Sequence, residues 1–255
     1  MTGAGSPLDV EVGGDGPDLV LLHGGAGSRD ELDELRALIG PGRRIIAPDQ
    51  RAHGRSPDLG ELSYPLMAAD TAGVLDELGV RAADIVGFSD GGIVALLLAR
   101  DRPALVGRVV AIGANVSWAP PAPGIYTDGY MARLATITAA DLPMPEVRRI
   151  LPGAVEAWPA IVEKYRALWL GEPGITMADL AGIQTPILYV VGDGDTRVEH
   201  TVAMYRATPG SQLAVVPGTG HDVPRSRPAD LAAIVQRFLE PRPAAQPGRQ
   251  RPSGA

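Results

Sequence analysis

The sequence predicts a doubly wound α/β fold, in which helices cover both faces of a mainly parallel sheet. Short, nearly continuous apolar runs recur along the chain and end in turn residues, which is typical of buried parallel strands. Stretches with apolar residues at helical spacing separate these runs. Strands that alternate with helices in this way favour a parallel sheet with right-handed crossovers.

The first elements follow directly from the apolar pattern. Residues 18–22 and 44–48 are apolar runs that end in turn residues, so each predicts a buried strand. Between them, residues 29–39 place apolar side chains such as Leu32 and Leu35 on one face of a helix.

The same alternation continues further along the chain. Residues 65–78 carry apolar side chains at helical spacing, a strand at 85–86 follows, and residues 93–100 predict the next helix. The remaining core elements are strands at residues 109–112, 187–191 and 213–216 and a closing amphipathic helix at residues 229–239.

The alternation stops between residues 115 and 183, a stretch that holds all three tryptophans. We expect prolines to break it into short helical pieces, at Pro143, Pro145, Pro152, Pro159 and Pro173. We therefore predict a helical cap, residues 115–183, over the carboxyl edge of an α/β core made of residues 1–114 and 184–240. Residues 241–255 are rich in proline without an apolar pattern, and we predict that this tail is disordered.

Composition excludes several classes of function. A net charge of -7 without a Lys/Arg-rich run argues against a nucleic-acid partner, because phosphate binding needs clustered cations. The absence of cysteine excludes a thiolate nucleophile and a zinc-thiolate site, and the four histidines are scattered rather than spaced as metal ligands. We expect a mechanism without metal or cofactor, acting on a small-molecule substrate.

The location follows from what the chain does not contain. Residues 1–12 lack the charged and apolar regions of a secretion signal, and no run approaches the roughly 20 apolar residues of a membrane span. We expect a cytoplasmic protein with no membrane partner, and the sequence leaves the oligomeric state open.

The segment Gly87-Phe88-Ser89-Asp90-Gly91-Gly92 is the strongest chemical signal. It lies between a predicted strand and a predicted helix, so Ser89 is expected on a tight turn with its hydroxyl exposed above the helix N-terminus, which suits a nucleophile. The flanking glycines are expected because larger side chains would collide where strand and helix pack closely. In a glycine-rich chain the motif alone is weak evidence, so other segments have to supply a base, an acid and oxyanion donors.

His221 is the candidate base. It follows a late strand in the glycine-rich run Pro217-Gly218-Thr219-Gly220, where its ring can reach over the sheet edge. His23, His53 and His200 are the alternatives.

Asp195 is the candidate acid. It ends a strand, and the order serine, aspartate, histidine along the chain matches the order used by this type of strand-turn-helix nucleophile. Asp193 is the alternative, although its place in the turn favours a side chain that bonds its own backbone.

The negative oxygen that develops in acyl chemistry needs hydrogen-bond donors, and backbone N–H groups suffice. The glycine loop after residues 18–22 lies beside the serine turn, so we predict an oxyanion hole made by the N–H groups of Gly25 and Asp90. A phosphate-binding loop is disfavoured because the Lys-Ser/Thr ending of a P-loop is missing, and a merely structural turn is the other alternative.

These segments together resemble the ordered motifs of the α/β-hydrolase superfamily over about residues 18–240. The matching segments are His23-Gly24-Gly25, Asp49 to Ser56, the Ser89 turn, Gly192 to Asp195, and Gly218 to His221. The resemblance implies an α/β-hydrolase fold with a Ser89-His221-Asp195 triad beneath a helical cap, and a structural role for the loop that contains Arg51 and His53. Ser89 argues against the members of the superfamily that use aspartate as nucleophile.

Within that superfamily, the segment from Ser89 to Ile93 and the segment Gly113-Ala114-Asn115 are similar to those of biphenyl-hydrolase-like proteins of the valacyclovir-hydrolase type. In those proteins an aspartate after the nucleophile holds the substrate ammonium group, which implies the same role for Asp90. The alternatives are that Asp90 caps the helix N-terminus or faces away from the pocket.

The predicted function is a serine hydrolase that cleaves a small ester, thioester or lactone through an acyl-enzyme. The cap aromatics are candidates for the substrate pocket, with ordinary packing as the alternative: Trp118, Tyr126, Tyr130, Trp158 and Trp169. Of these, Tyr126, Tyr130 and Trp158 are the ones we predict to bind substrate. Two other functions stay open: acyl transfer, cyclisation or rearrangement on the same scaffold, and a ligand-binding module without catalysis.

Overall fold

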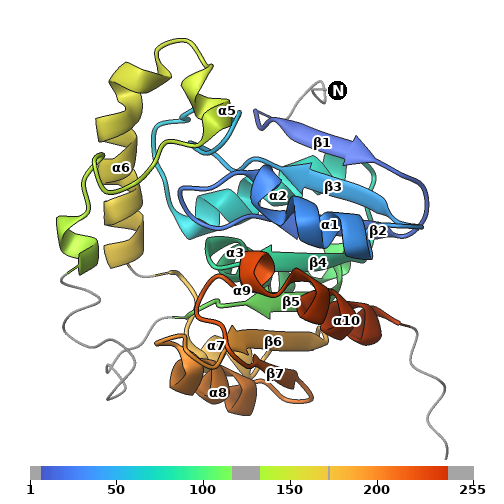
Figure 1. The fold of residues 1–255 in the computed structure, drawn as a ribbon. Helices are drawn as coiled ribbons and strands as arrows, with labels where there is room; N and C mark the ends of the chain where they lie inside the picture. The colour runs from blue at the N-terminus through green and yellow to red at the C-terminus, as the bar shows by residue number, and fades with distance from the viewer. Residues whose placement is uncertain (1–6, 117–132, 172, 241–255) are drawn as a thin grey trace, which may run out of the picture.

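The computed structural model describes residues 7–116, 133–171 and 173–240. Its centre is a seven-stranded sheet with the order β1-β3-β2-β4-β5-β6-β7, in which only β1 runs antiparallel to its neighbour (Figure 1). The strands are β1 Val10–Gly13, β2 Asp18–Leu22, β3 Arg44–Pro48, β4 Ala83–Phe88, β5 Val106–Ile112, β6 Ile187–Gly192 and β7 Gln212–Val216. The mainly parallel sheet predicted from the sequence is confirmed.

Helices cover both faces of the sheet. Those before β5 are η1 Arg29–Leu32, α1 Asp33–Ile39, α2 Tyr64–Glu77, α3 Asp90–Asp101 and η2 Pro103–Leu105. Those after it are α5 Glu146–Arg149, α6 Ala154–Leu170, α7 Met177–Leu180, α8 Val198–Ala207, α9 Val223–Ser226 and α10 Pro228–Leu239. Helices α1 and α10 share one apolar cluster with the sheet, and α2, α3 and α8 share another on the opposite face.

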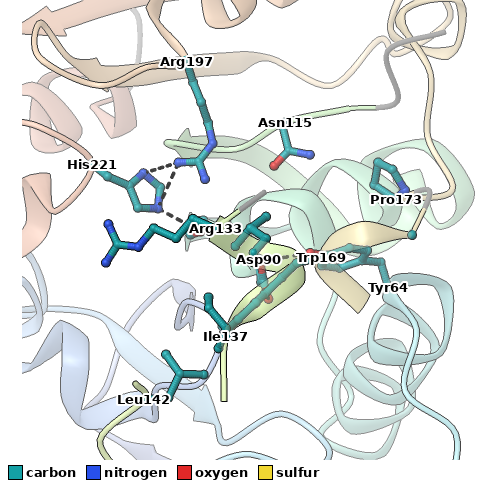
Figure 2. A pocket seen from close by; sticks show the side chains of 14 residues that line it. Tyr64, Asp90, Asn115, Arg133, Ile137, Leu142, Trp169, Pro173, Arg197 and His221 are labelled. Atoms are coloured by element: carbon teal, nitrogen blue, oxygen red, sulfur yellow. Dashed lines mark hydrogen bonds between the residues drawn. The ribbon is translucent and has the colours of Figure 1, made fainter. Parts of the chain in front are cut away.

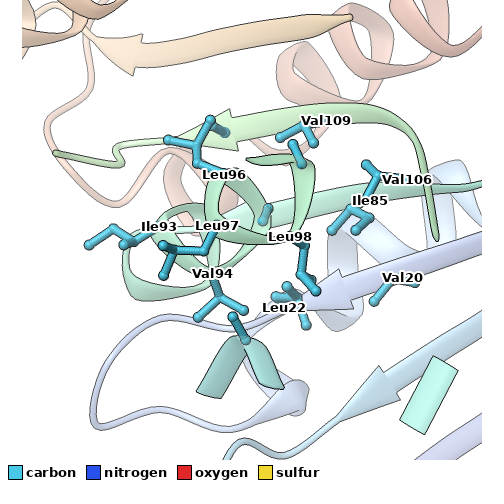
Figure 3. Packing of buried hydrophobic residues seen from close by; sticks show 14 of the residues in the cluster. Val20, Leu22, Ile85, Ile93, Val94, Leu96, Leu97, Leu98, Val106 and Val109 are labelled. Atoms are coloured by element: carbon cyan, nitrogen blue, oxygen red, sulfur yellow. The ribbon is translucent and has the colours of Figure 1, made fainter. Parts of the chain in front are cut away.

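Helix α3 is the central support of the site. Every residue from Asp90 to Ala99 is buried, and side chains such as Val94 and Leu98 pack among apolar residues of the neighbouring strands (Figure 3). Burying one such side chain completely stabilises the fold by about 1.5–3 kcal/mol. The turn that precedes α3 is therefore attached to a helix that is buried along ten successive residues, Asp90 to Ala99.

The strands at residues 18–22 and 44–48 match the predicted bounds, whereas β4 and β5 begin earlier than predicted. Strand β1 was not predicted, because it has only four residues at the sheet edge and carries no apolar run. The expectation that Pro159 ends a helical piece was wrong, since α6 runs through it. Pro159 is the sixth residue of α6, where the proline leaves out the one hydrogen bond to the Val155 carbonyl and the rest of the helix continues.

Helix α6 stands beside the sheet, between β5 and β6 in the chain, at the position predicted for the cap (Figure 1). Among the helices of the described residues, none combines the length and the apolar character that a membrane span requires.

Candidate active site

Ser89 occupies the sharp turn between β4 and α3. Its backbone lies at φ 50° and ψ -114°, a left-handed conformation that side chains rarely adopt. Its N–H donates to the carbonyl of Ile112 at 2.7 Å, which ties the turn to β5. A Cβ atom at Gly87 would lie 2.3 Å from the carbonyl oxygen of Gly91, and one at Gly91 would lie 2.2 Å from that of Leu22. The close packing predicted for these glycines is confirmed.

The fold brings Ser89, His221 and Asp195 together from three loops at one edge of the sheet. Ser89 Oγ lies 3.0 Å from His221 Nε2, and His221 Nδ1 lies 2.9 Å from Asp195 Oδ2. A tautomer with its proton on Nδ1 donates to the carboxylate and leaves Nε2 to accept from the serine hydroxyl. This is the arrangement in which an imidazole removes a proton from a serine.

The Asp195 carboxylate is held from both sides. Oδ2 contacts His221, while Oδ1 accepts from the N–H of Arg197 at 3.0 Å. Burial acts to raise the pKa of Asp195, but the hydrogen bond with His221 and the charge of Arg197 outweigh it, so the pKa falls below its ordinary value. Asp195 is therefore poised to stay ionised.

Asp193 has a different place. Its Oδ1 accepts from the N–H groups of Gly218 and Thr219, at 2.8 and 3.3 Å. The side chain thus bonds the loop that carries His221, not its own turn as the sequence predicted. Asp193 therefore has a structural role, since its carboxylate holds the loop that carries His221 through that loop's backbone.

A cavity of about 380 Å³ opens over the serine (Figure 2). It is lined by Gly25, Tyr64, Ser89, Asp90, Asn115, Arg133, Leu134, Ile137, Leu142, Trp169, Gly171, Pro173, Arg197 and His221. Asp90 is the first residue of α3, so its N–H has no acceptor within the helix. Gly25, on the loop after β2, lines the same cavity, and both predicted oxyanion donors therefore border the space above Ser89.

The Asp90 side chain is buried beneath this cavity. Oδ1 accepts from the hydroxyl of Tyr64 and Oδ2 from Nε1 of Trp169, both at 3.0 Å. Burial raises the pKa of Asp90 despite these two donors, which favours the neutral acid relative to a free aspartate. Each carboxylate oxygen of Asp90 therefore already accepts a hydrogen bond from the protein. The binding of a substrate ammonium group by Asp90 stays a prediction.

The aromatic candidates of the cap fare differently. Trp158 lies outside the cavity lining; it packs with Ile161 and Tyr165, and its Nε1 donates to the Leu142 carbonyl at 3.3 Å. Its helix turns that side chain onto other residues of the predicted cap instead of the cavity, and Trp169 borders the cavity in its place. Tyr126 and Tyr130 lie outside the described residues.

The other histidines are buried structural groups. His23 Nε2 accepts from the N–H of Gln50 at 3.0 Å, and His200 Nε2 accepts from that of Val116 at 3.1 Å. Burial lowers the pKa of His53 to about 3 and, together with the charge of Arg197, that of His200 to about 4.

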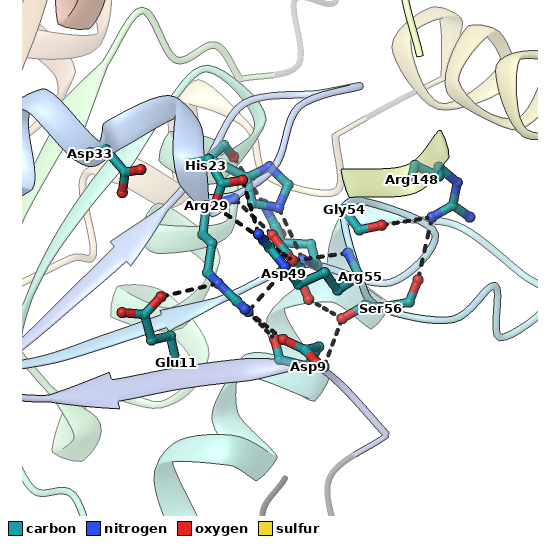
Figure 4. A network of polar contacts seen from close by, with 12 residues as sticks. Asp9, Glu11, His23, Arg29, Asp33, Asp49, Gly54, Arg55, Ser56 and Arg148 are labelled. Atoms are coloured by element: carbon teal, nitrogen blue, oxygen red, sulfur yellow. Dashed lines mark hydrogen bonds and ion pairs between the residues drawn. The ribbon is translucent and has the colours of Figure 1, made fainter. Parts of the chain in front are cut away.

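The loop that follows β3 is a polar junction (Figure 4). The Asp49 carboxylate accepts from the backbone N–H of Arg29 at 2.7 Å and from that of Arg55 at 2.9 Å. Arg51 forms a two-pronged pair with Asp70, whose oxygens lie 2.5 and 2.7 Å from its Nε and Nη2. These contacts give the loop the structural role that its sequence resemblance implies.

Sequence reasoning missed Arg197 and Tyr64, which contact the proposed machinery, and named Trp169 only as one of several aromatic residues of the predicted cap. Arg197 places Nη1 2.6 Å from His221 Nδ1 and 3.2 Å from Nε2 (Figure 2). Its position two residues after Asp195 is a signal that the sequence offered. Tyr64 and Trp169 reach Asp90 from α2 and α6, and no local pattern indicates these contacts.

Within the described ranges, no cluster of three or more histidine, aspartate or glutamate side chains is arranged to hold a metal ion. The arrangement can support acyl transfer to a serine: Ser89, His221, Gly25 and Asp90 border one cavity, and the Asp195 carboxylate contacts the imidazole.

Comparison with known proteins gives matches over most of the chain. Residues 19–234 match the model of the alpha/beta hydrolase family. The sn-1-specific diacylglycerol lipase ABHD11 of Mus musculus is 29% identical over 252 residues, covering 88% of this chain and 81% of that protein. The pimeloyl-acyl-carrier-protein methyl ester esterase of Aromatoleum aromaticum is 30% identical over 247 residues, covering 86% and 97%.

Among solved structures, a malate-bound thermophilic esterase from Thermogutta terrifontis superimposes with a TM-score of 0.68 at 26% identity. That match covers 91% of this chain and 92% of the esterase chain.

Proposed function

This chain belongs to the alpha/beta hydrolase family and is a hydrolase, and from that premise we propose that it cleaves a small-molecule ester, thioester or lactone through an acyl-enzyme on Ser89. One observation carries the proposal: the unbroken contact chain from Ser89 Oγ through His221 to Asp195, with distances of 3.0 and 2.9 Å. The names of the relatives, a lipase and an esterase, support a carboxylic ester as the substrate.

In the first half-reaction, Ser89 Oγ forms a bond to the acyl carbonyl carbon while His221 Nε2 takes the hydroxyl proton. The carbonyl oxygen becomes negative and accepts from the N–H groups of Gly25 and Asp90. The bond to the leaving group then breaks, and the leaving oxygen or sulfur takes the proton from His221. Asp195 stabilises the imidazolium that exists between these steps.

In the second half-reaction, water attacks the acyl carbon and gives a proton to His221. The bond to Ser89 breaks, and Ser89 Oγ takes the proton back. The products are a carboxylic acid and the alcohol or thiol released earlier; a lactone gives one hydroxy acid. The cavity of about 380 Å³ is of a size that suits a small substrate. A cytoplasmic location belongs to this proposal.

Hydrolysis of a panel of p-nitrophenyl esters, aminoacyl esters and lactones tests the proposal. We expect the wild type to turn over at least one of them and Ser89→Ala to lose about 10³-fold or more in kcat. Ser211→Ala, which removes a hydroxyl from the turn before β7, is the matched control and is expected to keep full activity. Equal turnover by the Ser89→Ala protein would contradict the proposal.

A further inference from the structure

Arg197 lies against the proposed catalytic imidazole. Its side chain is only 7% exposed, its Nη1 lies 3.6 Å from Asp195 Oδ2, and the same nitrogen approaches both ring nitrogens of His221. Arg197 also borders the substrate cavity (Figure 2). One guanidinium thus contacts the base, the acid and the space where a substrate binds.

This position places a permanent positive charge beside the proposed base. A neutral imidazole that donates from Nδ1 to Asp195 and accepts at Nε2 from Ser89 has no further acceptor for an arginine N–H. When the imidazole takes the serine proton, its positive charge faces a guanidinium that is already buried beside it. The Asp195 carboxylate, 2.9 Å from Nδ1, then has to balance both positive charges.

The charges around the cavity favour an anion. Arg133 supplies a second guanidinium to its lining. Asp90 is the carboxylate of the cavity lining and accepts from Tyr64 and Trp169, whereas Asp195 lies outside the lining and is committed to His221. A substrate that carries a negative group would therefore find cationic donors in the cavity and would offset the charge beside His221.

We propose that Arg197 binds a carboxylate group of the substrate and thereby makes this hydrolase selective for esters of short dicarboxylic acids, an inference that rests on the proposed ester hydrolysis. A guanidinium offers two parallel N–H donors that match a carboxylate, and such pairs are directional as well as strong. Pairing with the substrate draws the guanidinium away from the ring nitrogens and leaves His221 to Ser89 and Asp195.

The spacing sets the length of the acid. Ser89 Oγ and Arg197 Nη1 lie 3.0 and 3.2 Å from the same nitrogen of His221, so they are within about 6 Å of each other. A substrate whose scissile carbonyl lies at Ser89 and whose carboxylate binds Arg197 therefore needs only a short chain between the two groups. Succinyl and glutaryl half-esters have chains of this length.

The test compares three ethyl esters of similar length: monoethyl glutarate, neutral ethyl pentanoate and cationic ethyl 4-(trimethylammonio)butanoate. Ethanol release gives kcat and KM for each ester. We expect the wild type to prefer monoethyl glutarate. In Arg197→Gln, the ratio of kcat/KM for the half-ester to kcat/KM for ethyl pentanoate should fall about 10- to 100-fold.

Two further variants serve as controls. Arg197→Lys keeps the charge without the planar fork and should recover part of the preference. Arg206→Gln removes the same charge from an exposed position of α8 outside the cavity and should leave all three rates unchanged. An equal fall for all three esters in Arg197→Gln would mean that Arg197 only supports the triad, and it would overturn the proposal, as would a wild-type preference for the cationic ester.

Binding of glutarate, measured by calorimetry on the Ser89→Ala protein, separates this inference from the proposed hydrolysis. Binding that weakens at least 10-fold on adding Arg197→Gln supports the carboxylate site even if the wild type hydrolyses none of the esters. Absence of glutarate binding to a folded Ser89→Ala protein overturns the site. Ester hydrolysis without such binding would leave the triad standing and remove Arg197 from substrate recognition.

Discussion

Replacing Asp195 with asparagine removes the charge from the proposed acid and hardly changes the shape of the side chain. Oδ1 accepts from the N–H of Arg197 at 3.0 Å, and an asparagine keeps its carbonyl oxygen there because that N–H needs an acceptor. The amide nitrogen then takes the place of Oδ2 and faces Nδ1 of His221, 2.9 Å away. An NH₂ group can only donate, so the imidazole is forced to carry its proton on Nε2 and can no longer accept from Ser89.

The size of the loss follows from these contacts. Losing one hydrogen bond to a charged group costs about 1.5–3 kcal/mol, which alone lowers kcat about 10- to 150-fold. Holding the wrong tautomer removes the base as well, and the combined loss in triads of this type is about 10⁴-fold, or about 5 kcal/mol. We expect a fall of about 10³- to 10⁴-fold in kcat for Asp195→Asn on the best ester of the panel.

Asp193→Asn is the matched control, two residues earlier on the same turn. Asp193 uses only Oδ1, which accepts from the N–H groups of Gly218 and Thr219, and an asparagine retains that acceptor. We expect kcat within about threefold of the wild type and a free energy of unfolding within about 1 kcal/mol. Equal losses in the two variants, at equal thermal stability, would refute the assignment of Asp195 as the acid.

Three further predictions concern the turn, the buried acid and the cap. Gly91→Ala should lower the free energy of unfolding by about 1–3 kcal/mol, because its Cβ would lie 2.2 Å from the Leu22 carbonyl; the opposite sign in denaturant unfolding would mean that helix propensity dominates. Because burial raises the pKa of Asp90, its protonated form stabilises the fold below the unfolded-state pKa of about 3.9, and this contribution is lost as the pH rises through the folded-state pKa. The unfolding free energy of Asp90→Asn relative to the wild type should therefore increase from pH 4 to pH 7, and a decrease would show that the two donors keep Asp90 ionised. Trp169→Phe, which removes the 3.0 Å bond to Asp90, should lower kcat/KM about 3- to 10-fold, whereas Trp158→Phe should stay within about twofold; the reverse order would return Trp158 to the pocket.

Local pattern predicted the parts of the site that local sequence determines. The turn around Ser89 needs a strand, glycines that permit close packing and a helix. All three are encoded by neighbouring residues between 83 and 101. The strands at residues 18–22 and 44–48 were also predictable, since buried parallel strands are marked by continuous apolar runs.

Contacts between distant segments were not predictable in the same way. Trp158, Tyr165 and Trp169 follow one another at helical spacing along α6, and sequence alone does not say which end of that stripe reaches the cavity. The structure places Trp169 against Asp90, while the hydroxyl of Tyr165 donates to the Ala52 carbonyl at 2.7 Å. Arg197 lies beside Asp195 in sequence, but its contact with His221 depends on the loop after β7.

Covalent labelling of Ser89 tests the central claim most directly. The folded wild type is treated with a fluorophosphonate, and the modified peptide is identified by mass spectrometry. We predict one adduct on Ser89, no adduct in Ser89→Ala, and much slower labelling in His221→Ala, because the imidazole lies 3.0 Å from the hydroxyl that reacts. No adduct on folded wild-type protein, or an adduct on another serine with Ser89 unmodified, would contradict the assignment of Ser89 as the nucleophile.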